Sequence, residues 1–547
     1  MNVNLLYSDR EWGNTKAYFD WNSICKDLGL EKLFKAAERE CVLRGTKIDY
    51  PGEKDTYLGA AVKKVMRIPL RSEEEVRYRQ EMIKDCIKKK AVVTELYEMS
   101  GRILEEWEKL GRKNNGMGVR DSKGRLITDI RILKLLVKGV SDVRALLEDN
   151  LSGFNSEGFT ALYERIINEF PEDYNLNIDD IINDLTFFSD ATGKKEERGN
   201  YVLYFPRVKI DCGLSDGLKL SDLKLEHIET IVKPYSNPRG VIAKLQSTIT
   251  SLTPGIISLY DDQSMMGDAA ELEYQTVSYV YSVCTPLVSS FGQFFDQLHF
   301  QTAFYLGVIN IRSHLQCHHI DYCFPEVGQK TDLKYDDLKE VVMNLEQGGE
   351  VVGNSGNLNG KQLVVITGAN QGGKSTFLRS IGIAQMMFQC GLFVAAKSYR
   401  SGLYSSVFAH FTRREDSAMN SGRLDEELRR MDQIVSNLGD DALLLLNESF
   451  ATTTEKEGSA IAYDIVRALK EEGVSIFTVT HLLSFAQRIY EESKDDEKVS
   501  FLSAEHLEDG RRTYRMIPHE PEMTSFGLEL YDQVLGEIKE ETENGNT

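Results

Sequence analysis

Hydrophobic and polar positions along the first 310 residues follow the period of an α-helix. Apolar residues recur three and four positions apart in four long stretches, at residues 71–90, 91–110, 130–147 and 274–305. This spacing puts the apolar side chains on one face of a helix, so the stretches are predicted to be long amphipathic helices that pack on one another. The pattern therefore predicts a mainly α-helical domain over residues 1–310.

One part of this region departs from the helical pattern. Turn-forming residues cluster near residues 189–199, and the segment Tyr201–Ile210 that follows is apolar and β-branched. We expect an extended element that is inserted into the helical domain at about residues 195–245.

After about residue 311 the pattern changes to short, nearly continuous apolar runs that are separated by helix-length stretches. The runs are residues 362–367, 405–411, 442–446 and 474–480. Such runs are typical of buried parallel strands, because helices cover both faces of a parallel sheet. The pattern predicts an α/β domain over residues 311–538, followed by a polar, acidic tail at residues 539–547 that should fray.

Composition narrows the class of protein. Apolar residues make up 41% and charged residues 27% of the 547 residues, which is typical of a globular chain and not of a fibrous or disordered one. No apolar run approaches the roughly 18 residues that a membrane span requires, and the first residues lack a basic and apolar export signal. We therefore expect a cytoplasmic protein without a membrane partner, whose scattered cysteines are reduced thiols.

The net charge of −20 is unevenly distributed along the chain. Residues 491–547 hold 16 acidic and 6 basic residues, whereas residues 61–138 hold 20 basic and 12 acidic residues. The net charge alone argues against a nucleic-acid partner, because Lys and Arg are the residues that neutralise phosphates. The basic segment leaves two interpretations open, namely an arm that binds nucleic acid and a solvated helical face.

Metal-capable side chains cluster between His314 and Cys323. The cluster lacks a Cys-x-x-Cys pair, and the segment 317–324 alternates in the manner of a strand, which would place its residues on opposite faces. Metal binding is therefore the less favoured interpretation of this cluster.

The segment Gly368-Ala-Asn-Gln-Gly-Gly-Lys374-Ser375 fits the phosphate-binding pattern G-x-x-x-x-G-K-[ST]. A predicted strand precedes it and a predicted helix follows it, as this motif requires. The glycines let backbone N–H groups point at a phosphate, and the helix N-terminus adds a favourable field. Lys374 would reach the β- and γ-phosphates of a nucleotide, and the Ser375 hydroxyl would bind Mg²⁺.

A second part of such a site follows the buried run at residues 442–446. Nucleotide hydrolysis needs carboxylates at the end of a second strand, which hold the metal and polarise the attacking water. Glu448 is predicted to be the general base, and the metal ligands are predicted to be Ser375, Asn447 and Glu448. Because Asn447 is a neutral amide where a carboxylate is usual, we predict weaker Mg²⁺ binding or slower turnover. His481 ends a third strand, where it would either lie beside the γ-phosphate as a catalytic residue or have a structural role.

The segment Thr367-Gly-Ala-Asn-Gln-Gly-Gly-Lys-Ser-Thr376 resembles the DNA mismatch-repair MutS family, whose loop reads Thr-Gly-Pro-Asn-Met-Gly-Gly-Lys-Ser-Thr. Residues 446–454 are similar to its Met-Asp-Glu-Ile-Gly-Arg-Gly-Thr-Ser-Thr segment, and Thr480-His481 to its Ala-Thr-His switch. The similarity includes further segments: residues 421–423 resemble the Ser-Gly-Arg signature, 524–527 the closing Lys-Ser-Tyr-Gly element, and 66–80 and 295–304 two phrases of the family's core domain.

This resemblance implies a multidomain protein in which a helical lever domain precedes a P-loop NTPase domain of the ABC and MutS type. It also implies a homodimer with composite ATPase sites, whose lever helices carry the nucleotide state to DNA, and it implies ATP and Mg²⁺ as cofactors. The nucleotide-binding residues that it implies are Gly368, Asn370, Gly372, Gly373, Lys374, Ser375 and Thr376.

The sequence also departs from the family pattern. The chain starts almost at the lever, so we expect the N-terminal mismatch-reading and connector domains to be absent. Leu424 and Asp425 replace the Ser-Thr of the signature, which places in doubt the contact of a neighbouring subunit with the γ-phosphate. Val351–Asn354 resembles the adenine-side segment but lacks its aromatic residue.

Two functions follow from these features. The leading hypothesis is an ATP-binding and ATP-hydrolysing sensor or clamp for DNA structure or damage, which acts in DNA repair or recombination and binds DNA through its backbone and shape. The alternative is a nucleotide-switched protein-interaction module with weak or no ATPase activity and no direct mismatch recognition, which Asn447 and the altered signature favour. A structural ATPase of the chromosome-maintenance type is disfavoured by the segments around Pro69 and Phe295.

Overall fold

In a computed structural model, the chain divides into two compact units. Residues 1–5 and 91–302 form the first unit, and residues 6–90 and 303–547 form the second. The domain boundary that the sequence predicts at about residue 311 stays a prediction. The structure describes residues 2–8, 16–44, 47–49, 57–112, 122–169, 186–187, 202–203, 208–215, 219–228, 262–347, 351–412, 422–439, 441–507 and 511–521.

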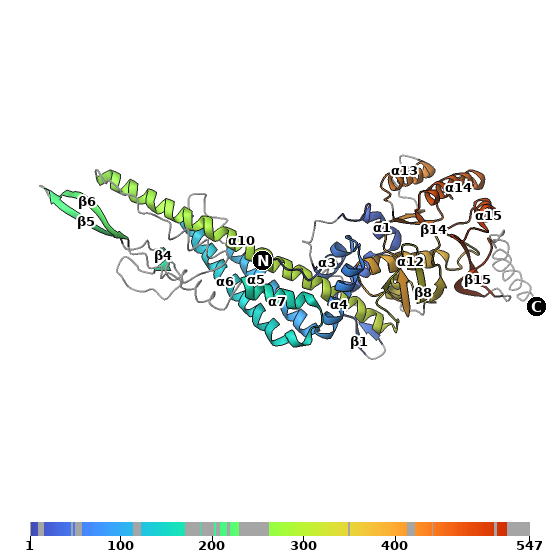
Figure 1. The fold of residues 1–547 in the computed structure, drawn as a ribbon, viewed down its shortest axis with the longest axis horizontal. Coiled ribbons are helices and arrows are strands. Elements are labelled where there is room, and N and C mark those ends of the chain that lie inside the picture. Colours follow the sequence, from blue (N-terminus) through green and yellow to red (C-terminus); the bar gives the residue numbers. More distant parts are fainter. Residues whose placement is uncertain are drawn as a thin grey trace, which may run out of the picture. The chain divides into compact units, whose positions relative to one another are not determined.

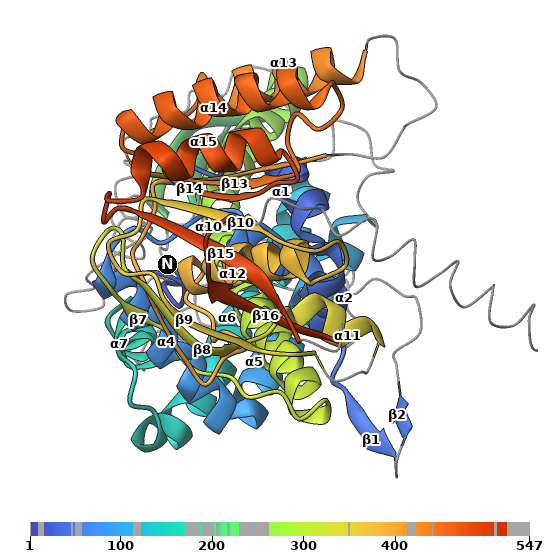
Figure 2. The same cartoon turned by 90° about the vertical axis from the view of Figure 1, so that its right-hand side faces the viewer.

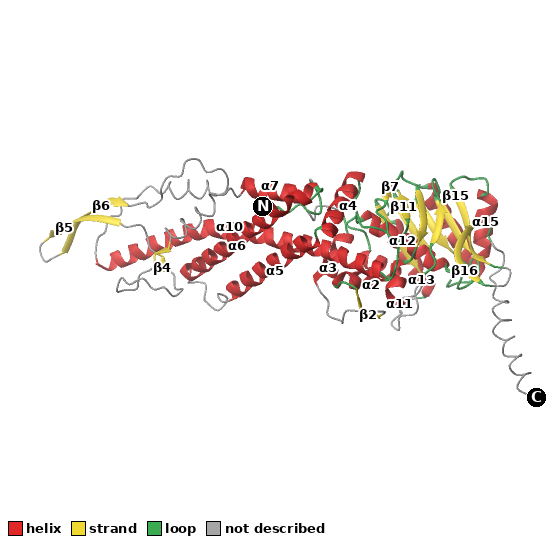
Figure 3. Ribbon diagram, turned by 90° about the horizontal axis from the view of Figure 1, so that it is seen from below, coloured by secondary structure: helices red, strands yellow, loops and turns green. Residues whose placement is uncertain are grey.

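Helices make up most of the first unit (Figure 3). They are α5 (Lys90–Arg112), α6 (Ser122–Asn150), α7 (Glu157–Glu169), the short turn η1 (Leu151–Gly153) and most of α10 (Asp262–Cys317). Figure 1 shows α10 in green as one long helix, and its last residues belong to the second unit. The helices that the sequence predicts at 91–110, 130–147 and 274–305 are therefore confirmed.

The helices of the first unit approach closely at Gly139 on α6. A Cβ atom at this position would lie 2.3 Å from Cδ1 of Ile103 on α5 and 2.8 Å from Cζ of Phe295 on α10. Since Ile103 and Phe295 are buried, a side chain at residue 139 would displace core groups. Glycine therefore sets the distance between these helices.

Strands are present in part of the region where an extended element is expected. β4 (Val202–Leu203) pairs with β3 (Thr186–Phe187), and β5 (Val208–Ser215) pairs with β6 (Lys219–Ile228), both in the antiparallel sense. The proposed limits of the insertion, 195–245, include residues outside those that the structure describes.

The second unit contains α and β elements in alternation. Its helices are α1 (Trp21–Leu28), α2 (Glu31–Glu38), α3 (Tyr57–Met66), α4 (Glu73–Lys88), α11 (Val341–Gln347), α12 (Lys374–Gln389), α13 (Arg423–Val435), α14 (Glu455–Glu471) and α15 (Leu483–Ser493). Its strands are β1 (Val42–Arg44), β2 (Lys47–Asp49), β7 (Glu326–Val327), β8 (Leu333–Leu338), β9 (Asn354–Asn357), β10 (Leu363–Thr367), β11 (Ser398–Ser401), β12 (Ser406–Phe411), β13 (Ala442–Asn447), β14 (Ser475–Val479), β15 (Val499–His506) and β16 (Arg512–Pro518).

A six-stranded sheet in the order β12-β13-β14-β10-β15-β16 organises this unit. The first five strands are parallel and β16 is antiparallel to β15. Helices α13, α14 and α15 lie on one side of the sheet and α12 lies on the other (Figure 2). Every residue of β10 and β14 is buried, as expected for strands with both faces covered. The predicted α/β character and the four predicted strands are confirmed.

The order of the strands decides where polar residues can meet. β14 lies between β10 and β13, and Val479 of β14 is level with Ile366 of β10 and with Asn447 of β13. The carboxyl ends of the three strands therefore lie at one edge of the sheet, and the loops that follow them are neighbours. A second sheet, in the order β7-β11-β8-β9, belongs to the same unit.

The strand that the sequence predicts at residues 317–324 is wrong. α10 continues to Cys317, because its buried face extends through Ile311 and Leu315, and a turn follows it. His314 lies 3.0 Å from the carbonyl oxygen of Arg39, and Cys317 donates to the carbonyl of Cys41. Within the described part of the chain, no three His, Cys, Asp or Glu side chains converge to hold a metal ion. None of the helices in that part is both long enough and apolar enough to cross a bilayer.

Arg79 of α4 joins three segments of the second unit. Its guanidinium has no exposed surface, and it donates to the carbonyl of Leu6 at 2.9 Å and to that of Cys390 at 3.3 Å. It also lies 4.6 Å from the centre of the Tyr7 ring. The next residue, Gln80, donates to the carbonyl of Pro325 at 3.0 Å. The Arg-Gln pair thus fixes α4 to chain segments that are remote in the sequence.

Replacing this guanidinium tests its contribution to stability. Arg79→Met should lower the free energy of unfolding by about 2–4 kcal/mol, because two buried carbonyls lose their donors. Urea denaturation followed by circular dichroism measures the change. Arg77→Met on the exposed face of the same helix is the matched control, and an equal loss in both variants would contradict the role of Arg79.

Candidate active site

The loop between β10 and α12 includes left-handed backbone conformations, which favour glycine. Gly368 and Gly373 have φ angles of 109° and 89°. A Cβ atom on Gly368 would lie 2.9 Å from the backbone nitrogen of Ala504, and one on Gly372 would lie 2.7 Å from Cβ of the same residue. The glycines of the motif therefore serve both the turn and its packing against β15.

The side chain of Lys374, the first residue of α12, makes hydrogen bonds back to the start of this loop. Its ammonium group donates to the carbonyl oxygens of Gly368 and Ala369, both at 2.7 Å, and the residue is only 4% exposed. These partners are neutral dipoles, and the charge of Lys374 also contributes to lowering the pKa of the Glu448 carboxylate. An anionic phosphate entering the loop would compete favourably for this ammonium.

Glu448 follows β13, in a backbone conformation that is rare for a residue other than glycine, with a φ angle of 55°. Its N–H group donates to the carbonyl of Val479 on β14 at 2.9 Å, and its side-chain Oε1 lies 2.9 Å from Nε2 of His481. The hydrogen bond from His481 lowers the pKa of Glu448, and burial opposes this effect. Glu448 is therefore a carboxylate at neutral pH and can accept a proton.

Asn447 has an unusual environment. Its Oδ1 atom is buried, and within the described part of the chain it has no hydrogen-bond partner. Ser375 and Glu448 line the cavity described below, whereas Asn447, the last residue of β13, is not part of that lining. A hydroxyl, an amide oxygen and one carboxylate are all hard oxygen donors, so the three residues fit Mg²⁺, with phosphate and water oxygens as its other ligands.

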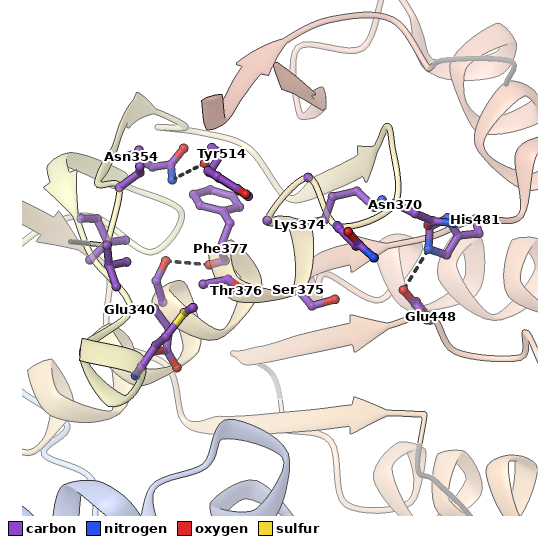
Figure 4. Close-up of a pocket in the computed structure, with 18 residues that line it drawn as sticks. Glu340, Asn354, Asn370, Lys374, Ser375, Thr376, Phe377, Glu448, His481 and Tyr514 are labelled. Carbon is purple, nitrogen blue, oxygen red and sulfur yellow. Dashed lines mark hydrogen bonds and ion pairs between the residues drawn. The ribbon is translucent and has the colours of Figure 1, made fainter. Parts of the chain in front are cut away.

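A cavity of about 500 Å³ joins these groups, and its size is within the range of small-molecule sites. Glu448 and His481 lie on one side of Lys374, and Asn354 and Tyr514 lie on the other (Figure 4). The cavity is lined by Leu338, Glu340, Met343, Val351, Val352, Asn354, Asn370, Gln371, Gly372, Gly373, Lys374, Ser375, Thr376, Phe377, Ser380, Glu448, His481 and Tyr514. Of the nucleotide-binding residues that the sequence implies, Gly368 alone is not in this lining.

The structure adds residues that no motif indicates. Tyr514 of β16 has a φ angle of 60°, and Asn354 fixes its backbone by donating to the Tyr514 carbonyl at 3.3 Å and by accepting from Met516 N–H at 2.7 Å. Glu340 and Phe377 also line the cavity. The segment Val351–Asn354 is the one sequence signal for this end of the site. Ser421 of the signature, residues 524–527 and the tail at 539–547 lie outside the described residues.

A glycine-rich loop after a buried strand, facing a carboxylate and a histidine from the next two strands, defines the class of P-loop NTPase folds. Comparison with known families agrees with this class. Residues 364–535 match the model of MutS domain V, and residues 71–196 match the MutS2 N-terminal domain. The chain belongs to the MutS family.

Individual relatives are similar to parts of the chain. Endonuclease MutS2 of Lacticaseibacillus casei is 32% identical over 159 residues, which are 29% of this chain and 20% of the relative. DNA mismatch repair protein MutS of Clostridium kluyveri is 29% identical over 155 residues, which are 28% of this chain and 18% of the relative. The alignments thus span about a fifth of the length of these relatives.

The unpartnered oxygen of Asn447 leads to a prediction. Asn447→Asp should lower the Mg²⁺ concentration needed for half-maximal nucleotide hydrolysis about tenfold, or roughly 1.4 kcal/mol, because a carboxylate adds charge where the amide has only a dipole. A magnesium titration of phosphate release measures this. Asn437→Asp, on the exposed residues after α13, adds the same charge remotely and is the control. An unchanged Mg²⁺ dependence in Asn447→Asp would show that this residue does not face the metal.

Proposed function

We propose that the protein binds and hydrolyses MgATP and acts as a dimeric DNA-binding sensor or clamp in DNA repair or recombination. The observation that carries the proposal is the hydrogen-bonded pair Glu448–His481, which shares one cavity with Lys374 and the glycine-rich loop. Membership of the MutS family and similarity to proteins named for mismatch repair support the DNA role.

Each of these side chains would have a separate role in hydrolysis. Lys374 leaves the Gly368 and Ala369 carbonyls and binds the phosphates, while the backbone N–H groups of the loop hold the β-phosphate. Glu448 accepts a proton from the attacking water, and the hydrogen bond of His481 orients its carboxylate. Ser375, Asn447 and Glu448 would hold Mg²⁺, which when bound neutralises phosphate charge.

The other end of the cavity suits a nucleotide base. Leu338, Met343, Val351 and Val352 supply apolar surface there, and Tyr514 supplies an aromatic ring. A flat, largely apolar purine would bury its faces against such groups, while polar atoms at the rim fix its orientation. We therefore assign the triphosphate to the loop and the adenine to this end.

DNA would bind through its backbone, with exposed basic side chains of the first unit as candidate phosphate contacts. On α5, Arg102 pairs with Glu95 and Glu98, and Lys109 pairs with Glu105. Lys138 on α6 is exposed. Basic side chains that contact phosphates would position the protein on DNA without reading its sequence. We also propose that α10 acts as the lever, because the one helix contributes residues to both units.

Phosphate release in the presence of different DNAs tests this proposal. One DNA structure among branched, mismatched and single-stranded forms should raise the ATPase rate roughly tenfold, which equals about 1.4 kcal/mol of barrier. DNA affinity should fall about tenfold when the salt concentration doubles, as expected for four neutralised phosphates. A rate that no DNA changes, together with an affinity that does not depend on salt, would contradict the DNA role.

A protein-interaction module is the second candidate function. The neutral Asn447 favours it, and so do two apolar side chains on α13, Leu428 and Val435, which are 38% and 45% exposed. Such a module would use the nucleotide as a switch for a protein partner, with little or no hydrolysis.

Lys374→Ala separates the two functions. A DNA sensor should lose ATP binding and the nucleotide-dependent retention of DNA together, because the phosphates lose their cation. DNA retention on an immobilised duplex, with and without ATP, measures this. Lys456→Ala on the exposed face of α14 is the control. Unchanged DNA retention combined with loss of a protein partner would favour the interaction module.

A further inference from the structure

The loop that carries Glu448 has a constrained backbone over three residues. Glu448 and Phe450 both have positive φ angles, 55° and 63°, although neither is a glycine. Phe450 has no exposed surface and belongs to the core under α14 and α15. Backbone of this kind persists only where surrounding groups hold it in place.

Glu427 of α13 is one of these groups. The residue is 6% exposed, and its Oε2 accepts a hydrogen bond from the N–H of Phe450 at 2.9 Å. Its Oε1 lies 3.4 Å from the hydroxyl of Thr412, which in turn lies 2.6 Å from the carbonyl oxygen of Glu448. The carboxylate and the hydroxyl thus hold the loop on both sides of Ser449.

His410 of β12 holds the residue between them. The ring has no exposed surface, and its Nε2 lies 3.2 Å from the main-chain carbonyl of Glu427. A carbonyl only accepts, so Nε2 carries a proton, and Nδ1 lies 2.7 Å from the Ser449 hydroxyl, which donates to the His410 carbonyl at 2.9 Å. Each of the three loop residues therefore has a partner on β12, on α13 or just after β12.

α13 is itself anchored away from the loop. Arg430 donates to the carbonyl of Phe411 at 3.0 Å and pairs with the buried Asp27 of α1 at 3.0 Å. These contacts set the position of α13 along β12. Glu427, one helical turn before Arg430, is thereby directed at the loop.

We propose that Glu427 is a positioning residue for the general base, which sets the place of Glu448 through Phe450 and Thr412. This inference rests on the proposed ATPase function. Through Glu427, the start of α13, where the sequence resembles the family signature, would be linked to the catalytic carboxylate Glu448. A purely structural carboxylate would affect the amount of folded protein and leave the turnover of the folded fraction unchanged.

Steady-state kinetics of the full chain test the proposal. Glu427→Ala should lower kcat at least tenfold while the KM for ATP changes less than threefold, because the nucleotide loop is untouched and the base is displaced. Glu427→Gln keeps an acceptor for the Phe450 N–H and should restore kcat to within about threefold of the native value. Glu426→Ala, the preceding residue, is the matched control. Equal kcat in Glu427→Ala and the native chain overturns the proposal.

Two further measurements keep the proposal testable. If Glu427→Ala does not fold, Thr412→Val removes the hydroxyl that contacts the Glu448 carbonyl and should lower kcat with the same pattern; an unchanged kcat overturns the inference. If the native chain has no ATPase activity, the proposed hydrolysis fails, and hydrogen exchange of residues 448–452 decides the positioning role separately. Faster exchange of these amides in Glu427→Ala than in Glu426→Ala supports the proposal, and equal exchange overturns it.

Discussion

The candidate site depends on the alignment of three parallel strands. β14 lies between β10 and β13, and Val479 is level with residues of both neighbours, so the three carboxyl ends coincide. The strands are buried almost to their last residues, and the polar side chains that line the cavity lie beyond those ends. The glycine-rich loop, Glu448 and His481 therefore meet at one edge of the sheet, although more than a hundred residues separate Gly368 from His481. A shift of one residue in the register of β13 against β14 would separate the carboxylate from the histidine.

Much of the second unit can be predicted from the sequence, because its main signals are local. The apolar runs that form β10, β12, β13 and β14 indicate strands that are buried on both faces. The spacing of the glycines indicates the backbone conformation of the phosphate loop. The acidic residue after β13 and the histidine after β14 stand next to such runs, so their meeting follows from a parallel sheet. The resemblance to the MutS family rests on the same segments.

Other parts of the site leave no local signal. Glu427 looks in the sequence like one of several acids on an amphipathic helix, and only the packing of α13 against β12 turns it toward Phe450. Tyr514 contributes to the cavity through a positive φ angle, and Asn354, which is remote in the sequence, makes hydrogen bonds to the backbone of Tyr514 and Met516. The strand expected at 317–324 fails for a related reason, since alternation over a few residues does not reveal that a preceding helix continues. Such features depend on contacts between distant segments, which neither periodicity nor motif spacing contains.

The buried charges of the second unit share one physical property. Arg79, Lys374 and Glu427 are all nearly inaccessible, and each makes hydrogen bonds to main-chain groups of a segment that must be held in place. Main-chain carbonyls and N–H groups stabilise such a charge inside the protein, where a hydrogen bond is electrostatically stronger than in water. For Arg79 the result is structural, because its partners are permanent. The ammonium of Lys374 could exchange its carbonyl partners for a phosphate. Through the hydrogen bond of Glu427 to Phe450, a displacement of α13 would move the loop that carries Glu448.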